Sequence, residues 1–351
     1  MYSESDIDGA VAAGALSREA AAALRNYVAA SSNAPAVDEE HFRLLTGFND
    51  IFVSIAIALL LAAIAQIGQT IWTPLAGGGV AVAAWLLAEY FTRQRRMALP
   101  SIILLLAFVG GVAATLVGVL VWANPDFSDT VNMLIGGGIA LVSAGAAWLH
   151  WRRFMVPITV AAGAAALVAM VAALAVAGVP EAARETVARE TVLYPVLLAC
   201  GIVVFGLAMW WDMSDTRRQT RRADVAFWLH LAAAPLIAHP VFQMLGVFNE
   251  SISLPIALVV LGLYLVFAFV ALAVDRRALL VSSLVYVLYA MYSLFHTAGA
   301  VELAWALTAL VIGSALLTLS AFWHPVRRIV VGTLGSLGNR LPPVGALTAS
   351  A

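Results

Sequence analysis

The sequence predicts an all-α membrane protein with about ten transmembrane helices. The chain is 63% hydrophobic and only 11% charged, with a mean hydropathy of +0.95, whereas a soluble domain carries about 25% charged residues. Apolar runs of roughly 20 residues, long enough to cross a ~30 Å hydrocarbon core, recur along the chain. Arginines gather in the polar turns between alternate runs, as in other multi-pass proteins.

The first 48 residues are polar and acidic. They lack the basic start and the apolar centre of a signal peptide. Within them we predict a helical hairpin, in which Gly14 ends the first helix and Ser17 caps the second. We expect Asp38 to cap a helix that runs into the first span. The predicted organisation is a cytoplasmic hairpin and linker at 1–37, a ten-span domain at 38–323 and a cytoplasmic tail at 324–351.

The length rule places ten spans in the remainder of the chain. They lie at about 49–71, 73–91, 99–122, 131–149, 155–178, 192–211, 224–246, 254–274, 278–297 and 300–322. A proline and a glycine run in "IWTPLAGGG" predict the turn between the first two. The glycine triplets at 77–79 and 136–138 indicate a turn or close helix packing, and the alanine-rich span at 160–178 indicates a tightly packed helix.

Arginine placement predicts the orientation of these spans. All 19 basic residues are arginine, and 17 of them fall in cytoplasmic segments if the N-terminus is inside. The other two, Arg184 and Arg189, share an outer loop with three glutamates. Because basic residues resist translocation, we expect both termini to be cytoplasmic, in a bacterial inner membrane.

Two kinds of internal symmetry fit the pattern. Five arginine pairs recur in the inner segments, and two of them begin similar text, "RRMALP" at 95–100 and "RRFMVP" at 152–157. A series of two-span hairpins with basic turns produces this period, and a hairpin duplication is the alternative. Five spans plus five, joined by the 179–191 loop, would instead form an inverted repeat of the transporter type.

Two resemblances follow from this layout. The segment "GALSREA" at 14–20, ahead of many spans, resembles bacterial polytopic inner-membrane proteins of a domain-of-unknown-function family with a short soluble N-terminal helical segment. That resemblance covers the first 70 residues or so and implies no functional residues. Ten spans with both ends inside resemble the drug/metabolite transporter superfamily in topology, without a motif shared between the halves.

The seventh span carries polar residues and prolines that lipid disfavours, in "PLIAHPVFQ" at 235–243. Pro235 and Pro240 each remove an amide donor and obstruct the carbonyl four residues earlier. Freed carbonyls inside a membrane need partners in protein or water. We therefore predict that this span is a broken helix facing protein or a wet cavity. His230 and His239 are nine residues apart, on opposite faces, so we expect them in separate sites.

The ninth span offers partners for this segment. Tyr286, Tyr289, Tyr292 and His296 follow helical spacing, and we expect Tyr289 or Tyr292 to donate to a freed carbonyl. Gln66 and Gln69 lie at the same outer depth. The structural alternative is an ordinary interfacial belt of tyrosine and histidine. The candidate cavity-lining residues are His239, Pro240, Gln243, Tyr289, Tyr292, His296 and Glu302.

No catalytic signature appears, so we expect neither enzyme activity nor a cofactor. The single Cys200 excludes a disulfide framework and a thiol metal site, and we expect no metal at His239, His296 and Glu302, which no local motif joins. Without a basic tract, nucleic acid is not a partner. The leading function is transport of a small solute or ion across the lipid bilayer. The alternative is a non-transporting scaffold or sensor whose residues 1–37 bind a cytoplasmic protein.

Overall fold

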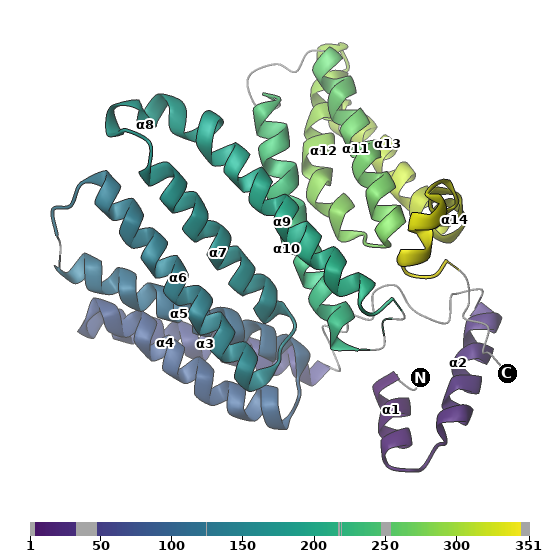
Figure 1. Ribbon diagram of the computed structural model, residues 1–351, viewed down its shortest axis with the longest axis horizontal. Helices are drawn as coiled ribbons and strands as arrows, with labels where there is room; N and C mark the ends of the chain where they lie inside the picture. Colours follow the sequence, from purple (N-terminus) through teal and green to yellow (C-terminus); the bar gives the residue numbers. More distant parts are fainter. Residues whose placement is uncertain are drawn as a thin grey trace.

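The computed structural model describes residues 4–32, 48–123, 125–216, 218, 220–246 and 254–344, and within these ranges it is built of helices without a strand (Figure 1). The α-helices are α1 (Glu4–Ala12), α2 (Arg18–Ser32), α3 (Phe48–Ile71), α4 (Thr73–Ala88), α5 (Ala98–Ala123), α6 (Asp129–Phe154), α7 (Ile158–Ala177), α8 (Glu181–Val187), α9 (Tyr194–Met213), α10 (Arg221–Met244), α11 (Leu254–Val274), α12 (Ala278–Thr297), α13 (Ala304–Ala321) and α14 (Trp323–Thr333). Two π-helical turns, η1 (Glu89–Gln94) and η2 (Ala188–Leu193), and a 3₁₀-helix, η3 (Gly335–Arg340), complete the elements.

Ten of these helices are long and apolar enough to cross a membrane. They coincide with the ten predicted spans, so the all-α polytopic fold class is confirmed. The main differences lie at span ends. The fourth span, α6, continues to Phe154. The tenth span, α13, begins at Ala304, because the Leu303 amide still closes a turn onto the Ala300 carbonyl. The linker that contains Asp38 lies outside the described residues.

The N-terminal helices α1 and α2 pack on each other. Gly14 adopts a left-handed conformation with φ of 72° after α1, where a side chain would be strained. The Ser17 hydroxyl accepts a hydrogen bond from the Ala20 amide at 3.1 Å and caps α2. Arg25 and Asp8 form an ion pair at 2.7 Å between the two helices.

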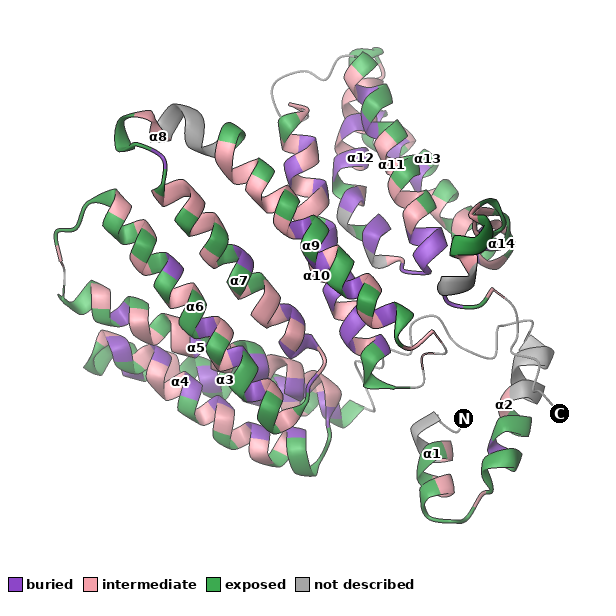
Figure 2. Cartoon of the chain, in the orientation of Figure 1, coloured by how far each residue is buried: buried purple, intermediate pink, exposed green. Residues whose placement is uncertain are grey.

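The spans form two groups that meet along α7, which packs against α9 and α10 (Figure 1). Half of the α10 span is buried, against 17–35% of every other span. Figure 2 shows this difference as more frequent purple along α10 and more green along the outer helices. Exposed apolar side chains such as Leu265 and Leu317 suit a lipid-facing surface. Helix α10 is thus the most buried span and the central helix of the second group.

The packed helix pairs repeat only in part between the two halves. The pairs that recur in the second half are α3 with α4, α5 with α6 and α6 with α7, which correspond to α9 with α10, α11 with α12 and α12 with α13. In the first half α4 packs most extensively on α5, the helix that follows it. The corresponding α10 packs instead on α9 and α12, and α10 with α11 is not among the extensively packed pairs of the described residues. The helix contacts therefore agree with a five-plus-five repeat only in part.

Close contact between α4 and α5 depends on glycine. A Cβ built on Gly77 would lie 2.3 Å from the Thr115 amide nitrogen, and one on Gly111 would lie 2.8 Å from the Ala81 nitrogen. Backbone therefore packs on backbone, which confirms close packing for the 77–79 triplet. The 136–138 triplet does not show it, because Gly136 and Gly138 face open space and Gly137 makes only ordinary side-chain contact.

One end of the bundle, here called the arginine end, holds the four turns that join η1 to α5, α6 to α7, α9 to α10 and α11 to α12. Each turn contains one non-glycine residue in the left-handed region, and together they are the only ones in the described ranges. They are Arg96, Met155, Arg218 and Asp275, with φ of 52–64°. Left-handed residues commonly end helices by redirecting the next amides to the last carbonyls, as the Arg276 amide does to Ala271 at 2.9 Å.

The C-terminal segment is structured where a tail was predicted. Helix α14 follows α13 directly and packs against α11. Trp323 and Arg327 on its inner face are buried, whereas Ile329 is 70% exposed. Residues 323–344 thus belong to the folded body of the protein.

Glycine packing between α4 and α5 yields a matched test. Gly77→Ala and Gly111→Ala should each destabilise the protein by roughly 1–3 kcal/mol, the usual range for an overpacked core. Thermal unfolding of the purified protein in detergent, followed by tryptophan fluorescence, measures the shift. Gly110→Ala is the control, because its Cβ meets nothing within 4 Å. An unchanged melting temperature in all three variants would contradict backbone contact between these helices.

Candidate functional site

Helix α10 runs without interruption from Arg221 to Met244 through both prolines, so the prediction of a broken seventh span is wrong. Pro240 still leaves the Leu236 carbonyl without its usual helical donor. Gly201 of α9 lies against that carbonyl, since a Cβ on Gly201 would come within 2.9 Å of the Leu236 oxygen. Close approach of α9 shields the freed group from lipid while the helix stays continuous.

His239 faces protein, as predicted, but its partner is Tyr286. The His239 Nδ1 atom and the Tyr286 hydroxyl share a hydrogen bond of 2.6 Å. Tyr286 also stacks on Phe242, with ring centroids 4.4 Å apart, and the Tyr194 ring of α9 meets His239 edge-on at 6.0 Å. Tyr289 packs against the same apolar cluster. The neighbourhood of His239 is therefore a packed aromatic core joining α9, α10 and α12.

The other candidates gather separately at the end of α12. Tyr292 stacks on Trp305 with centroids 4.4 Å apart and contacts the His296 ring at 5.8 Å. His296 and Glu302 are exposed, and so are Gln66 and Gln69 on α3. Gln243 is half-buried one turn after His239, and Pro240 is buried. The described contacts thus place His239 and Tyr289 in one aromatic group and Tyr292 and His296 in another.

A buried ionic network at the arginine end was not predicted. Its first centre is Asp212, the penultimate residue of α9, which is 1% exposed. Arg276 binds both carboxylate oxygens, at 2.6 and 3.2 Å, and its Nη2 also donates to the Ala223 carbonyl at 3.2 Å. The His230 Nε2 atom lies 3.2 Å from Asp212 Oδ2. Asp212 therefore ties α9 to α10 and to the turn before α12.

The second centre is Asp275, in the same turn. Its carboxylate accepts hydrogen bonds from Arg218 Nη1 at 3.1 Å and from Trp323 Nε1 at 2.9 Å, and Arg327 Nε lies 3.3 Å away. Arg327 extends the network by donating to the carbonyls of Leu272, Pro342 and Pro343. Arg277 lies over the Trp323 ring, 4.9 Å from its centroid. Asp275 thereby holds α14 and the following segment against α11.

Three arginines and two aspartates meet in this network, all with side chains at most 6% exposed. Burial lowers the pKa of the Arg218 guanidinium, Arg276 acts in the same direction, and the carboxylates of Asp275 and Asp212 oppose that shift. Arginine keeps its proton in proteins, so each buried charge is paired. The sequence signal was available in "WWDM" and "DRR", where an acidic residue adjoins a basic turn.

His230 and His239 occupy separate environments, which confirms the opposite-face prediction. His230 is fully buried between Asp212 and the Phe205 ring, whose centroid lies 5.2 Å away. Within the described residues its Nδ1 atom has no hydrogen-bond partner. His230 therefore belongs to the ionic network, and His239 to the aromatic core.

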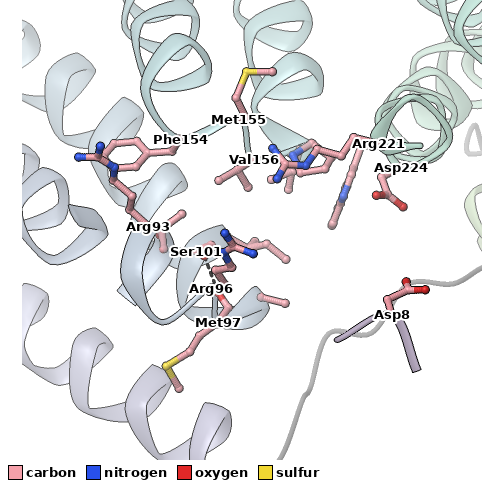
Figure 3. A pocket seen from close by; sticks show the side chains of 16 residues that line it. Asp8, Arg93, Arg96, Met97, Ser101, Phe154, Met155, Val156, Arg221 and Asp224 are labelled. Atoms are coloured by element: carbon pink, nitrogen blue, oxygen red, sulfur yellow. Dashed lines mark hydrogen bonds between the residues drawn. The ribbon is translucent and has the colours of Figure 1, made fainter. Parts of the chain in front are cut away.

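A cavity of about 590 Å³ opens at the arginine end (Figure 3). It lies between the end of η1 with the start of α5, the α6–α7 turn, and the first two turns of α10. Both similar segments, "RRMALP" and "RRFMVP", supply part of its wall, and Asp8 of α1 lies at its rim. None of the seven predicted cavity residues lines it. Its walls are formed by Asp8, Thr92, Arg93, Arg96, Met97, Ala98, Ser101, Ile102, Phe154, Met155, Val156, Pro157, Ile158, Arg221, Asp224 and Trp228.

The described residues form no metal centre at these sites. Among the described residues, no three histidine, cysteine, aspartate or glutamate side chains gather closely enough to hold an ion.

No protein-family model, curated protein or solved structure matches this chain. The cavity and the ionic network therefore carry the functional argument by themselves.

Removing either aspartate of the network tests its energetic weight. Asp212→Asn and Asp275→Asn keep the side-chain shape but leave buried arginines uncompensated, which typically costs about 3–5 kcal/mol. We expect a large drop in melting temperature in detergent and a lower yield for both. Asp126→Asn is the control, because Asp126 is exposed outside the network. Equal melting temperatures for all three variants would show that the network contributes little.

Proposed function

We propose that this integral membrane protein is a transporter of a small solute in a bacterial inner membrane, with both termini cytoplasmic. The cavity at the arginine end is the observation that carries this proposal. Its volume of about 590 Å³ lies within the range of roughly 300–1,000 Å³ usual for small-molecule sites. The transported solute would enter there from the cytoplasm.

The position of the cavity supports the same function. Its walls come from the first half of the chain and from α10, the central helix of the second half. Transporters commonly place their sites between two such groups of helices and expose them alternately. Trp228 lies two turns beyond Arg221, ~10 Å along α10, so the cavity extends from the rim into the apolar layer.

The second candidate is a scaffold or sensor, and the N-terminal hairpin is the observation that favours it. Among the described residues, α1 and α2 pack on each other and neither packs extensively on a span, although Asp8 lies at the rim of the cavity. Such a hairpin is free to bind a cytoplasmic protein. A scaffold has no need to expose its cavity to both sides of the membrane, which separates the two functions.

Orientation is tested with reporter fusions. Alkaline phosphatase is active only outside the cytoplasm, so a fusion after Ala351 should be inactive and a fusion in the loop near Asp126 should be active. Expression in a bacterium and whole-cell phosphatase assays measure both. The reverse pattern would contradict the cytoplasmic position of the arginine end and of both termini.

Alternating exposure is tested with single cysteines, after Cys200→Ser removes the native thiol. Ile102→Cys places a thiol at a half-buried position of the cavity wall, and a membrane-impermeant maleimide is applied to right-side-out and to inverted vesicles. A transporter should allow labelling from both sides. Asp126→Cys and Arg328→Cys, which replace exposed residues at opposite ends, report the sidedness of each preparation. Labelling of Ile102→Cys from the arginine side alone would favour the scaffold.

A further inference from the structure

The charges that line the cavity do not cancel locally. Arg93 is paired with Glu89 at 3.3 Å, and Asp8 with Arg25 at 2.7 Å. Asp224 also has an interaction of its own. Arg96 and Arg221, in contrast, form no hydrogen bond or ion pair through their side chains within the described part of the chain. Two guanidinium groups therefore remain available to a ligand.

These two arginines reach the cavity from opposite walls. Arg96 precedes α5, and its left-handed backbone, with φ of 53°, sets the direction of the turn there. Arg221 is the first residue of α10. Figure 3 shows both side chains extending into the space between these elements. Guanidinium groups bind carboxylate and phosphate oxygens through paired, charge-assisted hydrogen bonds.

The backbone adds to the positive potential. Helices α5, α7 and α10 all begin at the cavity wall, at Ala98, Ile158 and Arg221. A helix N-terminus carries a partial positive charge from its aligned peptide dipoles. An anion would be favoured by this arrangement, and a neutral solute would leave both arginines without partners.

Below the arginines the walls are apolar. Ile102, Phe154, Val156 and Trp228 line this part of the cavity. Such a surface favours burial of a hydrocarbon or aromatic group. The cavity therefore combines a cationic mouth with an apolar interior.

We infer that the cavity binds an organic anion, with its carboxylate or phosphate group between Arg96 and Arg221 and its apolar part against Trp228. This inference rests on the proposed transport function and names its substrate class. The same chemistry is present in a free metabolite and in the headgroup of an anionic lipid. A binding measurement that varies the ligand charge and the lipid distinguishes these sources.

The test uses the full-length protein in detergent at low ionic strength, with benzoate as the probe and saturation-transfer NMR as the readout. Benzamide, its neutral counterpart, should bind at least tenfold more weakly. Arg96→Gln and Arg221→Gln should each weaken benzoate binding by roughly tenfold or more, the loss of a charged hydrogen bond. Arg152→Gln should stay within about twofold, because Arg152 is exposed outside the cavity and lies over Trp148.

The source of the anion follows from two nanodisc preparations. If an anionic headgroup occupies the site, phosphatidylglycerol should weaken benzoate binding relative to phosphatidylcholine. If the ligand is a free solute, both preparations should bind benzoate equally. Either result supports an anion site.

Three outcomes would overturn the inference: wild-type protein that does not bind benzoate, equal affinity for benzoate and benzamide, or unchanged affinity in both cavity variants. The cysteine labelling described above stands apart from these measurements. Anion binding with labelling from one side alone retains the site and rejects transport. Labelling from both sides without anion binding retains transport and rejects the substrate class.

Discussion

Asp212 and Asp275 are the two anions on which the arginine end of the second half depends. Each accepts bonds from groups on several elements, and together they compensate three arginines whose side chains are almost entirely buried. An unpaired charge in such surroundings is costly by several kcal/mol. The turns before α10 and α12 and the segment after α13 are therefore held together, because each aspartate bonds groups from more than one of these elements.

The central place of α10 follows from this network and from its aromatic core. At one end His230 joins Asp212, and towards the other His239 joins Tyr286. Between these two histidines lies the Leu236 carbonyl, which Pro240 leaves without a helical donor. Helix α9 covers this carbonyl, because Gly201 has no side chain to hold it away. His230, His239 and the freed Leu236 carbonyl thus each face a different protein neighbour. The first turns of the same helix then contribute Arg221 and Trp228 to the cavity.

Among the described residues, the ion pairs whose side chains are both almost fully buried lie in the second half of the protein. In the first half, glycine lets α4 and α5 pack backbone against backbone, so van der Waals contact dominates. In the second half, aromatic stacking and buried ion pairs join α9 to α14. The cavity lies where these two kinds of packing meet.

Composition, apolar run length and arginine spacing were sufficient to predict ten spans and the all-α class, because the bilayer imposes length and polarity on each span separately. The sequence also placed His230 and His239 on opposite faces, which follows from helical geometry alone. It did not reveal that Tyr286 is the partner of His239, that Arg218, Arg276 and Arg327 are buried, or that Arg96 and Arg221 meet at one cavity. Those features join residues tens of positions apart, and their pairing depends on how the spans pack. Only the tertiary structure decides which arginines serve as buried counter-ions and which remain available to a ligand.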